Sequence, residues 1–118
     1  MDVKIKKVKT TRPPEDVLKK IRERDEDCVY CHKPFIKGDN NASATIEHLN
    51  HRKDWDSVGS YLNEGKDISK IVAICCHACN SSRSDKSLLE WFKTPYCKSI
   101  NYDTVSDVVR KYIDAYEK

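Results

Sequence analysis

Residues 71–80 read IVAICCHACN, a branched apolar run that leads directly into the cysteine pair Cys76 and Cys79. A second Cys-x-x-Cys pair, Cys28 and Cys31, lies upstream. A spacing of two residues lets both sulfurs turn toward one ion, and two such pairs are typical of a closed tetrahedral zinc site. We therefore expect these four thiolates to bind a structural Zn²⁺.

Disulfide bonds are the alternative use of the cysteines, of which the chain has six. The 118 residues are 38% hydrophobic and 35% charged, with a mean hydropathy of −0.76, so the apolar core is small for the length. A small core favours an additional staple, and structural zinc contributes about 10 kcal/mol or more to folding. The sequence contains neither the apolar run of a signal peptide nor a membrane span of roughly eighteen apolar residues. We therefore expect a cytoplasmic protein without a membrane partner, whose reduced thiols bind metal.

The length predicts a single domain over residues 1–118. Lysine and arginine concentrate in residues 1–12, which form either a solvated arm or an arm that contacts a nucleic-acid backbone. The net charge of +3 is mildly basic and is weak evidence by itself for nucleic acid. The informative motifs lie in residues 27–92, and a C-terminal helix is expected over residues 103–117.

The pattern between the cysteine pairs predicts a hairpin followed by a helix. Residues 43–48 and 71–75 read as two short strands suited to pairing. A helix is expected to begin near Cys79 and to continue to Phe92, before Pro95 ends it. Two strands and separate helices in this order predict an α+β fold.

Helices are also expected on both sides of this core. Residues 13–25 begin with prolines and acidic residues, which suit a helix start, and carry apolar residues on one face. Residues 103–117 repeat apolar side chains at the spacing of one helical face. Thr104, with Asp107 three residues later, resembles a capping box. We expect both helices to serve packing.

Three further residues near the cysteine pairs receive no metal role. Cys75 precedes a ligand, so in a strand its side chain points to the other face and packs as a small apolar group. His32 follows the first pair directly and is expected on the surface, since four cysteines already complete the site. No role is assigned to Cys97.

The combined pattern closely resembles one family. Residues 27–92 carry a Cys-x-x-Cys pair, a strand ending in an acidic residue and histidine, a branched strand, and Cys-x-x-Cys-Asn leading into a helix. This order is similar to that of the HNH endonucleases, a ββα-metal nuclease group. The resemblance implies a ββα-metal core, two strands and a helix, stapled by the four-cysteine zinc site. It also implies a metal-dependent enzyme that hydrolyses phosphodiester bonds of DNA.

The resemblance implies a role for each matching residue. His48 matches the general base that activates water, and Glu47 and Asn80 match the ligands of a catalytic divalent ion. Arg83 and Lys86 match basic residues that bind nucleic acid near the scissile strand. The chemistry agrees, because a neutral imidazole suits a base near pH 7 and oxygen ligands suit Mg²⁺ or Mn²⁺ better than zinc. Since adjacent strand residues point to opposite faces, we expect the strand to end at His48.

The middle of the motif departs from the family pattern. Ile71 stands where the family has its central asparagine, so Asn63 or Asp67 is expected to brace the loop instead, and we assign Asn63 to the catalytic set. The proline that commonly follows the first histidine is absent. His51 is therefore either a solvated loop residue or a further member of the site.

A non-catalytic zinc module that binds nucleic acid or a protein partner is the alternative function. In this alternative the four-cysteine site and the basic arm are kept, and Glu47, His48 and Asn80 have no shared role. The Glu47 carboxylate would, however, repel phosphate unless a cation intervenes. The chain has little room for a separate recognition domain. As an enzyme it is therefore expected either to cut DNA with weak specificity or to form a homodimer through residues 103–117 and nick both strands.

Overall fold

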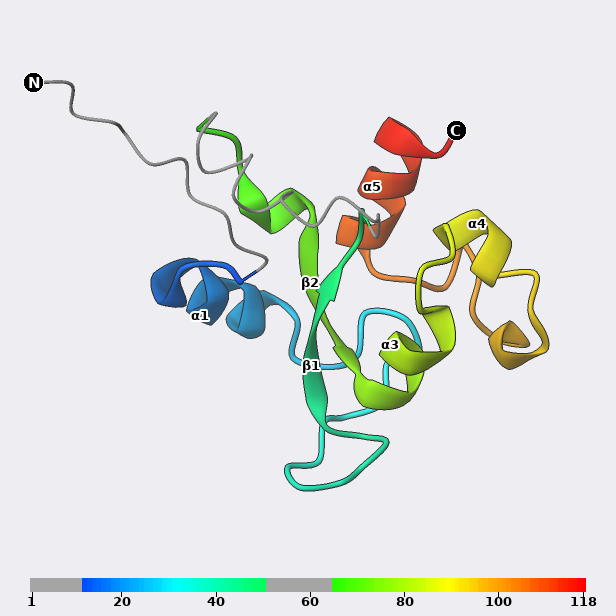
Figure 1. Cartoon of the computed structure of the whole chain (residues 1–118), viewed down its shortest axis with the longest axis horizontal. Coiled ribbons are helices and arrows are strands. Elements are labelled where there is room, and N and C mark those ends of the chain that lie inside the picture. The colour runs from blue at the N-terminus through cyan, green and yellow to red at the C-terminus, as the bar shows by residue number, and fades with distance from the viewer. Residues whose placement is uncertain (1–11, 51–64) are drawn as a thin grey trace, which may run out of the picture.

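The computed structural model describes residues 12–50 and 65–118, which form a mixed α+β fold around a two-stranded antiparallel sheet (Figure 1). The elements in chain order are α1 (Glu15–Arg24), β1 (Ala44–His48), η1 (Ile68–Lys70), β2 (Val72–Cys76), α3 (His77–Arg83), α4 (Leu88–Trp91), η2 (Pro95–Cys97) and α5 (Asp107–Tyr116). The predicted α+β class, the hairpin and the flanking helices are confirmed.

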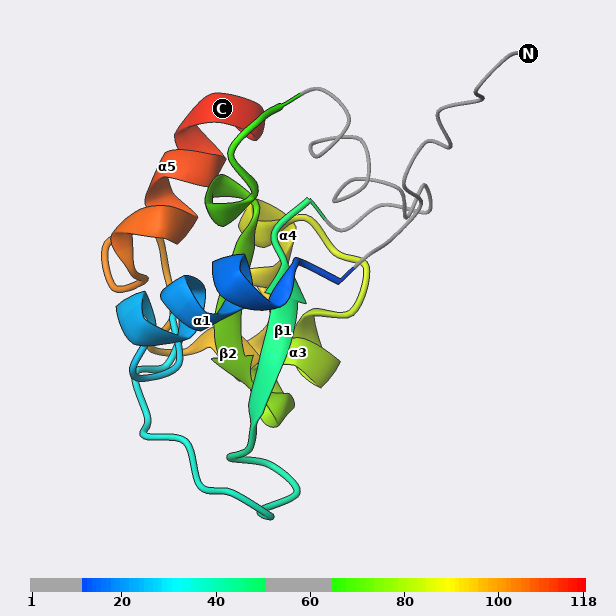
Figure 2. The same ribbon diagram turned by 90° about the vertical axis from the view of Figure 1, so that its left-hand side faces the viewer.

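The sheet lies between helices. Ile46 of β1 is paired with Ile74 of β2 at the centre of the register. Every residue of β2 is buried, whereas β1 buries only Glu47. A fully apolar strand of this kind suits a position covered on both faces. Figure 2 shows α1 crossing one face of the sheet, with α3 and α4 behind the other.

Two side chains at the end of α1 form hydrogen bonds with the backbone at the outer edge of β2. Asp25 Oδ2 accepts a hydrogen bond from the Ile74 N–H at 3.0 Å, and Arg24 Nη2 donates to the Val72 carbonyl at 2.9 Å. Arg24 and Asp25 also form an ion pair at 2.8 Å. Unpaired backbone groups at a buried strand edge would be costly. These side chains therefore replace the backbone of a third strand.

The helix expected over residues 79–92 is divided into α3 and α4. α3 ends at Arg83, and Ser84 follows with φ 50°, a left-handed conformation that is uncommon outside glycine. Ser87 then caps α4, because its Oγ accepts a hydrogen bond from the Glu90 N–H at 3.3 Å. Serine competes with helical hydrogen bonding in a helix interior and favours caps, which explains the break.

The C-terminal helix is shorter than the predicted residues 103–117. α5 begins at Asp107, and Thr104 does not cap it. Thr104 Oγ1 instead accepts a hydrogen bond from the Asn101 N–H at 2.9 Å. The carboxylate of Glu117, just beyond α5, accepts hydrogen bonds from two backbone N–H groups at the start of α4, at 3.0 and 2.9 Å. The C-terminus is thereby tied to α4.

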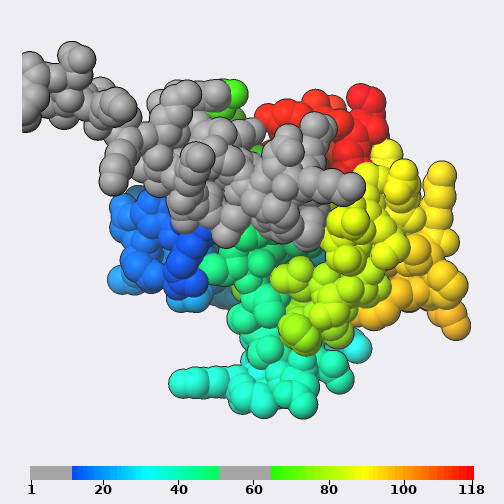
Figure 3. Space-filling view, in the orientation of Figure 1, coloured from blue at the N-terminus to red at the C-terminus, as the bar shows by residue number. Residues whose placement is uncertain are grey.

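Several predictions lie outside the described residues. They concern the basic arm up to residue 11, His51 and Asn63. Within the described parts of the chain, no helix is both long enough and apolar enough to cross a membrane. The space-filling view shows the segment that precedes β1, in teal, standing out from the body (Figure 3).

Candidate metal centre and active site

The sulfur atoms of Cys28, Cys31, Cys76 and Cys79 lie within 4.8 Å of one another. Cys31 Sγ and Cys76 Sγ are 3.8 Å apart. Tetrahedral zinc with Zn–S bonds of about 2.3 Å places its sulfurs about 3.8 Å apart, whereas a disulfide bond is about 2.05 Å long. The predicted four-cysteine cluster is confirmed, and its spacing fits a structural zinc ion.

Local hydrogen bonds bring the two cysteine pairs together. The second pair spans the junction of β2 and α3. The first lies in a tight turn that His32 closes, with φ 61° and an N–H that donates to the Cys28 carbonyl at 2.9 Å. The Val29 N–H donates to the Ile74 carbonyl at 3.2 Å, which docks this turn on β2. The His32 side chain is exposed, as expected, and contacts the Thr104 carbonyl outside the cluster.

Crowding drives the pKa values of the clustered thiols apart. The hydrogen bond with Cys79 lowers the pKa of Cys28 to about 4, and the same hydrogen bond raises the pKa of Cys79. Burial raises the pKa of Cys31 to about 11. The hydroxyl of Tyr96 lies 3.3 Å from Cys79 Sγ as a further partner. A divalent cation that binds all four sulfurs displaces the remaining thiol protons and offsets part of the negative charge of the thiolates.

The two remaining cysteines lie outside the cluster. Cys75 is fully buried, and its Sγ lies 3.5 Å from Thr45 Oγ1. Burial raises the pKa of Cys75 well above its usual range. The prediction that Cys75 packs in the core is confirmed. Cys97 is also buried, at the end of η2.

Glu47 points into the interior and is 1% exposed. Its Oε2 accepts a hydrogen bond from the Tyr30 hydroxyl at 2.6 Å and lies 3.4 Å from Arg83 Nη1. Its Oε1 is buried and has no hydrogen-bond partner among residues 12–50 and 65–118. Burial raises the pKa of this carboxyl, while the charge of Arg83 acts in the opposite direction. One oxygen is therefore anchored, and the other is enclosed in the interior.

Asn80 of α3 is docked against β1 beside Glu47. Its Nδ2 donates to Thr45 Oγ1 at 3.1 Å and to the Ile46 carbonyl at 3.3 Å. Thr45 Oγ1 itself donates to the Cys75 carbonyl at 2.8 Å, so it must accept from Asn80. This orientation leaves Asn80 Oδ1 without a hydrogen bond from the described residues.

These two oxygens provide a test of whether the site fits a divalent ion. A carboxylate and an amide oxygen are ligands that Mg²⁺ and Mn²⁺ prefer. Leaving a buried acceptor such as Glu47 Oε1 unpaired costs about 1–3 kcal/mol, which a bound cation would offset. Glu47 and Asn80 match this preference in the chemistry of their oxygens, although Glu47 is 1% exposed. The positive charge of Arg83 acts against a bound cation, because that charge lies beside the same carboxylate.

His48 is the last residue of β1, as expected. It is paired with Val72 and is partly exposed. Strand alternation turns its side chain away from the buried Glu47. Its carbonyl accepts a hydrogen bond from Arg83 Nη1 at 3.2 Å, which holds the end of the strand.

Arg83 occupies the interior, in contrast to its predicted surface role in binding nucleic acid. It is 1% exposed, and it donates to the carbonyls of Leu49 at 2.6 Å and of Lys86 at 3.0 Å. A guanidinium carries five donors and can bind several carbonyls at once where the chain leaves regular structure. Lys86 is partly exposed, and its Nζ contacts the Ser82 carbonyl at 3.3 Å.

The role of Tyr30 was missed in the sequence. The residue is buried. Its place between Cys28 and Cys31 could have indicated this role, because an aromatic residue held between two metal ligands has a fixed position. Tyr96 was missed as well, since nothing in the sequence marks it as a partner of Cys79.

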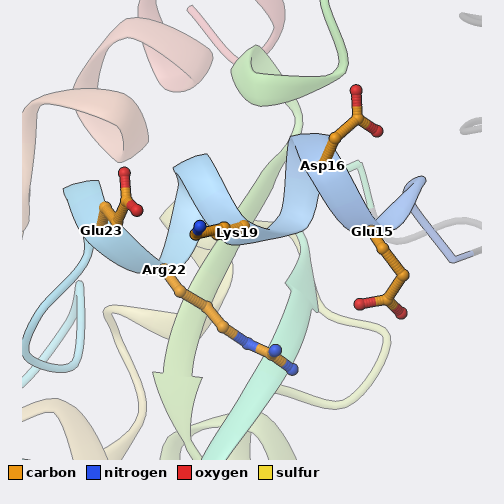
Figure 4. Close-up of a pocket in the computed structure, with 5 residues that line it drawn as sticks. All are labelled: Glu15, Asp16, Lys19, Arg22 and Glu23. Atoms are coloured by element: carbon orange, nitrogen blue, oxygen red, sulfur yellow. The ribbon is translucent and has the colours of Figure 1, made fainter.

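A separate hollow of about 680 Å³ runs along α1 (Figure 4). It is lined by Glu15, Asp16, Lys19, Arg22 and Glu23. It shares no residue with the cysteine cluster or with the pair of oxygen donors, so it is not part of the candidate site.

Comparison with protein-family models, curated proteins and solved structures gave no significant match.

Proposed function

We propose that this protein is a metal-dependent endonuclease of the HNH type that hydrolyses phosphodiester bonds of DNA. The observation that carries the proposal is the docking of Asn80 on the Ile46 carbonyl at 3.3 Å, next to Glu47. It supports a pair of oxygen ligands from β1 and α3, beside the four-cysteine clamp. The order of these pieces in the chain is that of the HNH family.

Each residue has one task in the proposed reaction. His48 accepts a proton from the water that attacks phosphorus. Its side chain leaves β1 on the face opposite to Glu47, so this task requires the end of β1 to turn when the ion and DNA bind. Glu47 and Asn80 hold Mg²⁺ or Mn²⁺ through oxygen. When bound, such an ion supplies positive charge for the phosphate and for the departing 3′ oxygen. Lys86 binds the DNA backbone through its charge. The four-thiolate zinc has no open coordination position and maintains the scaffold.

A plasmid nicking assay with Mg²⁺ or Mn²⁺ tests this function. His48→Ala is expected to slow cleavage by about 10²–10⁴-fold, the usual contribution of a general base. His77→Ala is the matched control, because His77 is an exposed histidine at the start of α3. The proposal fails if wild-type protein does not cut DNA in the presence of any divalent ion. It also fails if His48→Ala cuts as fast as the control.

The ion pair between Glu47 and Arg83, at 3.4 Å, favours a second candidate function. A carboxylate already neutralised by arginine attracts a cation less strongly. In this alternative, the protein is a zinc module that binds nucleic acid or a protein partner without cleavage. Titration of the zinc-loaded protein with Mn²⁺ separates the two, since only the enzyme is expected to bind Mn²⁺ in a manner that Asn80→Ala abolishes.

We also propose a cytoplasmic location, where reduced thiols keep a four-thiolate site intact. Homodimerisation through α5 is proposed as the way to cut both strands. Tyr116 at the end of α5 is 60% exposed and would lie in such an interface. Sedimentation of wild-type protein and of Tyr116→Ala tests the dimer, which the substitution should weaken.

A further inference from the structure

We infer that Tyr30 is a positioning residue that couples the zinc clamp to the ion-binding carboxylate of Glu47. The inference rests on the proposed function, since it concerns the same ion site. The Tyr30 hydroxyl donates to Glu47 Oε2 at 2.6 Å, and both residues are 1% exposed. The contact joins a residue inside a zinc-binding turn to the carboxylate 17 positions later in the chain.

Tyr30 has little freedom to move. It lies between Cys28 and Cys31, which belong to the cysteine cluster. Its ring packs edge-on against Trp91, with ring centroids 4.9 Å apart and an interplanar angle of 71°. An ion that holds both cysteines restrains the backbone on either side of Tyr30. The position of the hydroxyl therefore depends on the zinc site.

The hydroxyl determines which oxygen of Glu47 is anchored. It occupies Oε2, whereas Oε1 is buried and has no hydrogen-bond partner in the described part of the chain. A ligand held by a neighbouring hydrogen bond binds metal with less loss of freedom, and removal of such a partner typically weakens metal affinity by about 10–100-fold. Arg83 is less suited to this task, because its Nη1 lies 3.4 Å from Oε2 while its Nη2 bonds the Leu49 carbonyl at 2.6 Å.

Mn²⁺ binding to the zinc-loaded full chain, measured by electron paramagnetic resonance, tests the inference. Tyr30→Phe is expected to weaken Mn²⁺ binding by about tenfold without loss of zinc. Tyr102→Phe is the matched control, because it removes a tyrosine hydroxyl that donates to the Asp114 carboxylate at 2.9 Å and belongs to neither proposed metal site. This control is expected to bind Mn²⁺ as wild type does.

The outcomes separate the inference from the proposed function. If Tyr30→Phe binds Mn²⁺ as wild type does while Glu47→Gln loses it, the inference is wrong and the proposed function stands. If wild-type protein binds no Mn²⁺, both are overturned. If Tyr30→Phe loses zinc, the tyrosine ring signals of isotope-labelled wild-type protein, measured by NMR, test the inference instead. Bound Mn²⁺ should then broaden the ring signal of Tyr30 more than that of Tyr96, and equal or reversed broadening overturns the inference.

Discussion

Arg83 Nη2 donates to the backbone carbonyl of Leu49 at 2.6 Å, inside the molecule and just beyond the end of β1. The same guanidinium binds the carbonyls of His48 at 3.2 Å and Lys86 at 3.0 Å. It therefore joins the end of β1 to the turn that follows α3. A lysine would not reproduce this arrangement, because its ammonium lacks the planar fork of donors.

Replacement of Arg83 is expected to destabilise the fold strongly. Arg83→Ala leaves the buried carboxylate of Glu47 without its charged partner, and breaking a buried ion pair in this way costs about 3–5 kcal/mol. Urea unfolding of the zinc-loaded protein measures the change. Arg22→Ala, at an exposed position on α1, should change the free energy of unfolding by about 0.5 kcal/mol or less. A loss below about 1 kcal/mol for Arg83→Ala would contradict the buried ion pair.

Removal of the Asp25 carboxylate is expected to open the edge of β2. Asp25→Ala leaves the buried Ile74 N–H without its acceptor, at a cost of about 1–3 kcal/mol. Hydrogen exchange measured by NMR should show faster exchange of the Ile74 amide. Asp16→Ala, at an exposed position on the same helix, is the control and should leave this amide protected. Unchanged protection in Asp25→Ala would mean that the carboxylate does not pair the edge.

Adjacent cysteines are expected to differ sharply in zinc binding. Cys76→Ala should lose the metal, and with it the folded structure, because Cys76 belongs to the four-sulfur cluster. Cys75→Ala should retain zinc, since Cys75 packs in the core. Elemental analysis of both purified variants measures the metal directly. Equal zinc content in the two variants would exclude the proposed ligand set.

Cys75 is expected to resist alkylation in the folded protein. Burial raises the pKa of its thiol well above the usual range of a cysteine, so the reactive thiolate fraction near neutral pH is smaller than that of an exposed cysteine. Iodoacetamide at about pH 8, followed by peptide mass spectrometry, should leave Cys75 unmodified until denaturant and chelator are added. Rapid modification of Cys75 in folded protein would be incompatible with its burial.

Lys86 is expected to contribute to the salt dependence of DNA binding. A phosphate contact releases about one counterion, so Lys86→Ala should reduce the slope of log affinity against log salt by about 1. Lys111→Ala, at an exposed position on α5, is the matched control and should leave the slope unchanged. Identical slopes for the two variants would remove Lys86 from the DNA-binding surface.

The sequence by itself determined the features that depend on short-range spacing. The two Cys-x-x-Cys pairs specified the four-sulfur cluster, because each pair can turn to one ion only over such a short loop. The branched run of residues 71–75 specified β2 to within one residue, since side-chain alternation and burial act locally. The end of β1 at His48 was predicted from the implied active site, because Glu47 and His48 can face one ion only where the strand ends.

Only the tertiary structure decided which distant groups meet. Arg83 and Leu49 are 34 residues apart, and Asp25 and Ile74 are 49 apart, yet each pair is joined by a hydrogen bond. A charged side chain in a sequence is assigned to the surface by default, because burial is favourable only when partners are in place. Those partners are backbone groups that every residue carries, so no local pattern marks them.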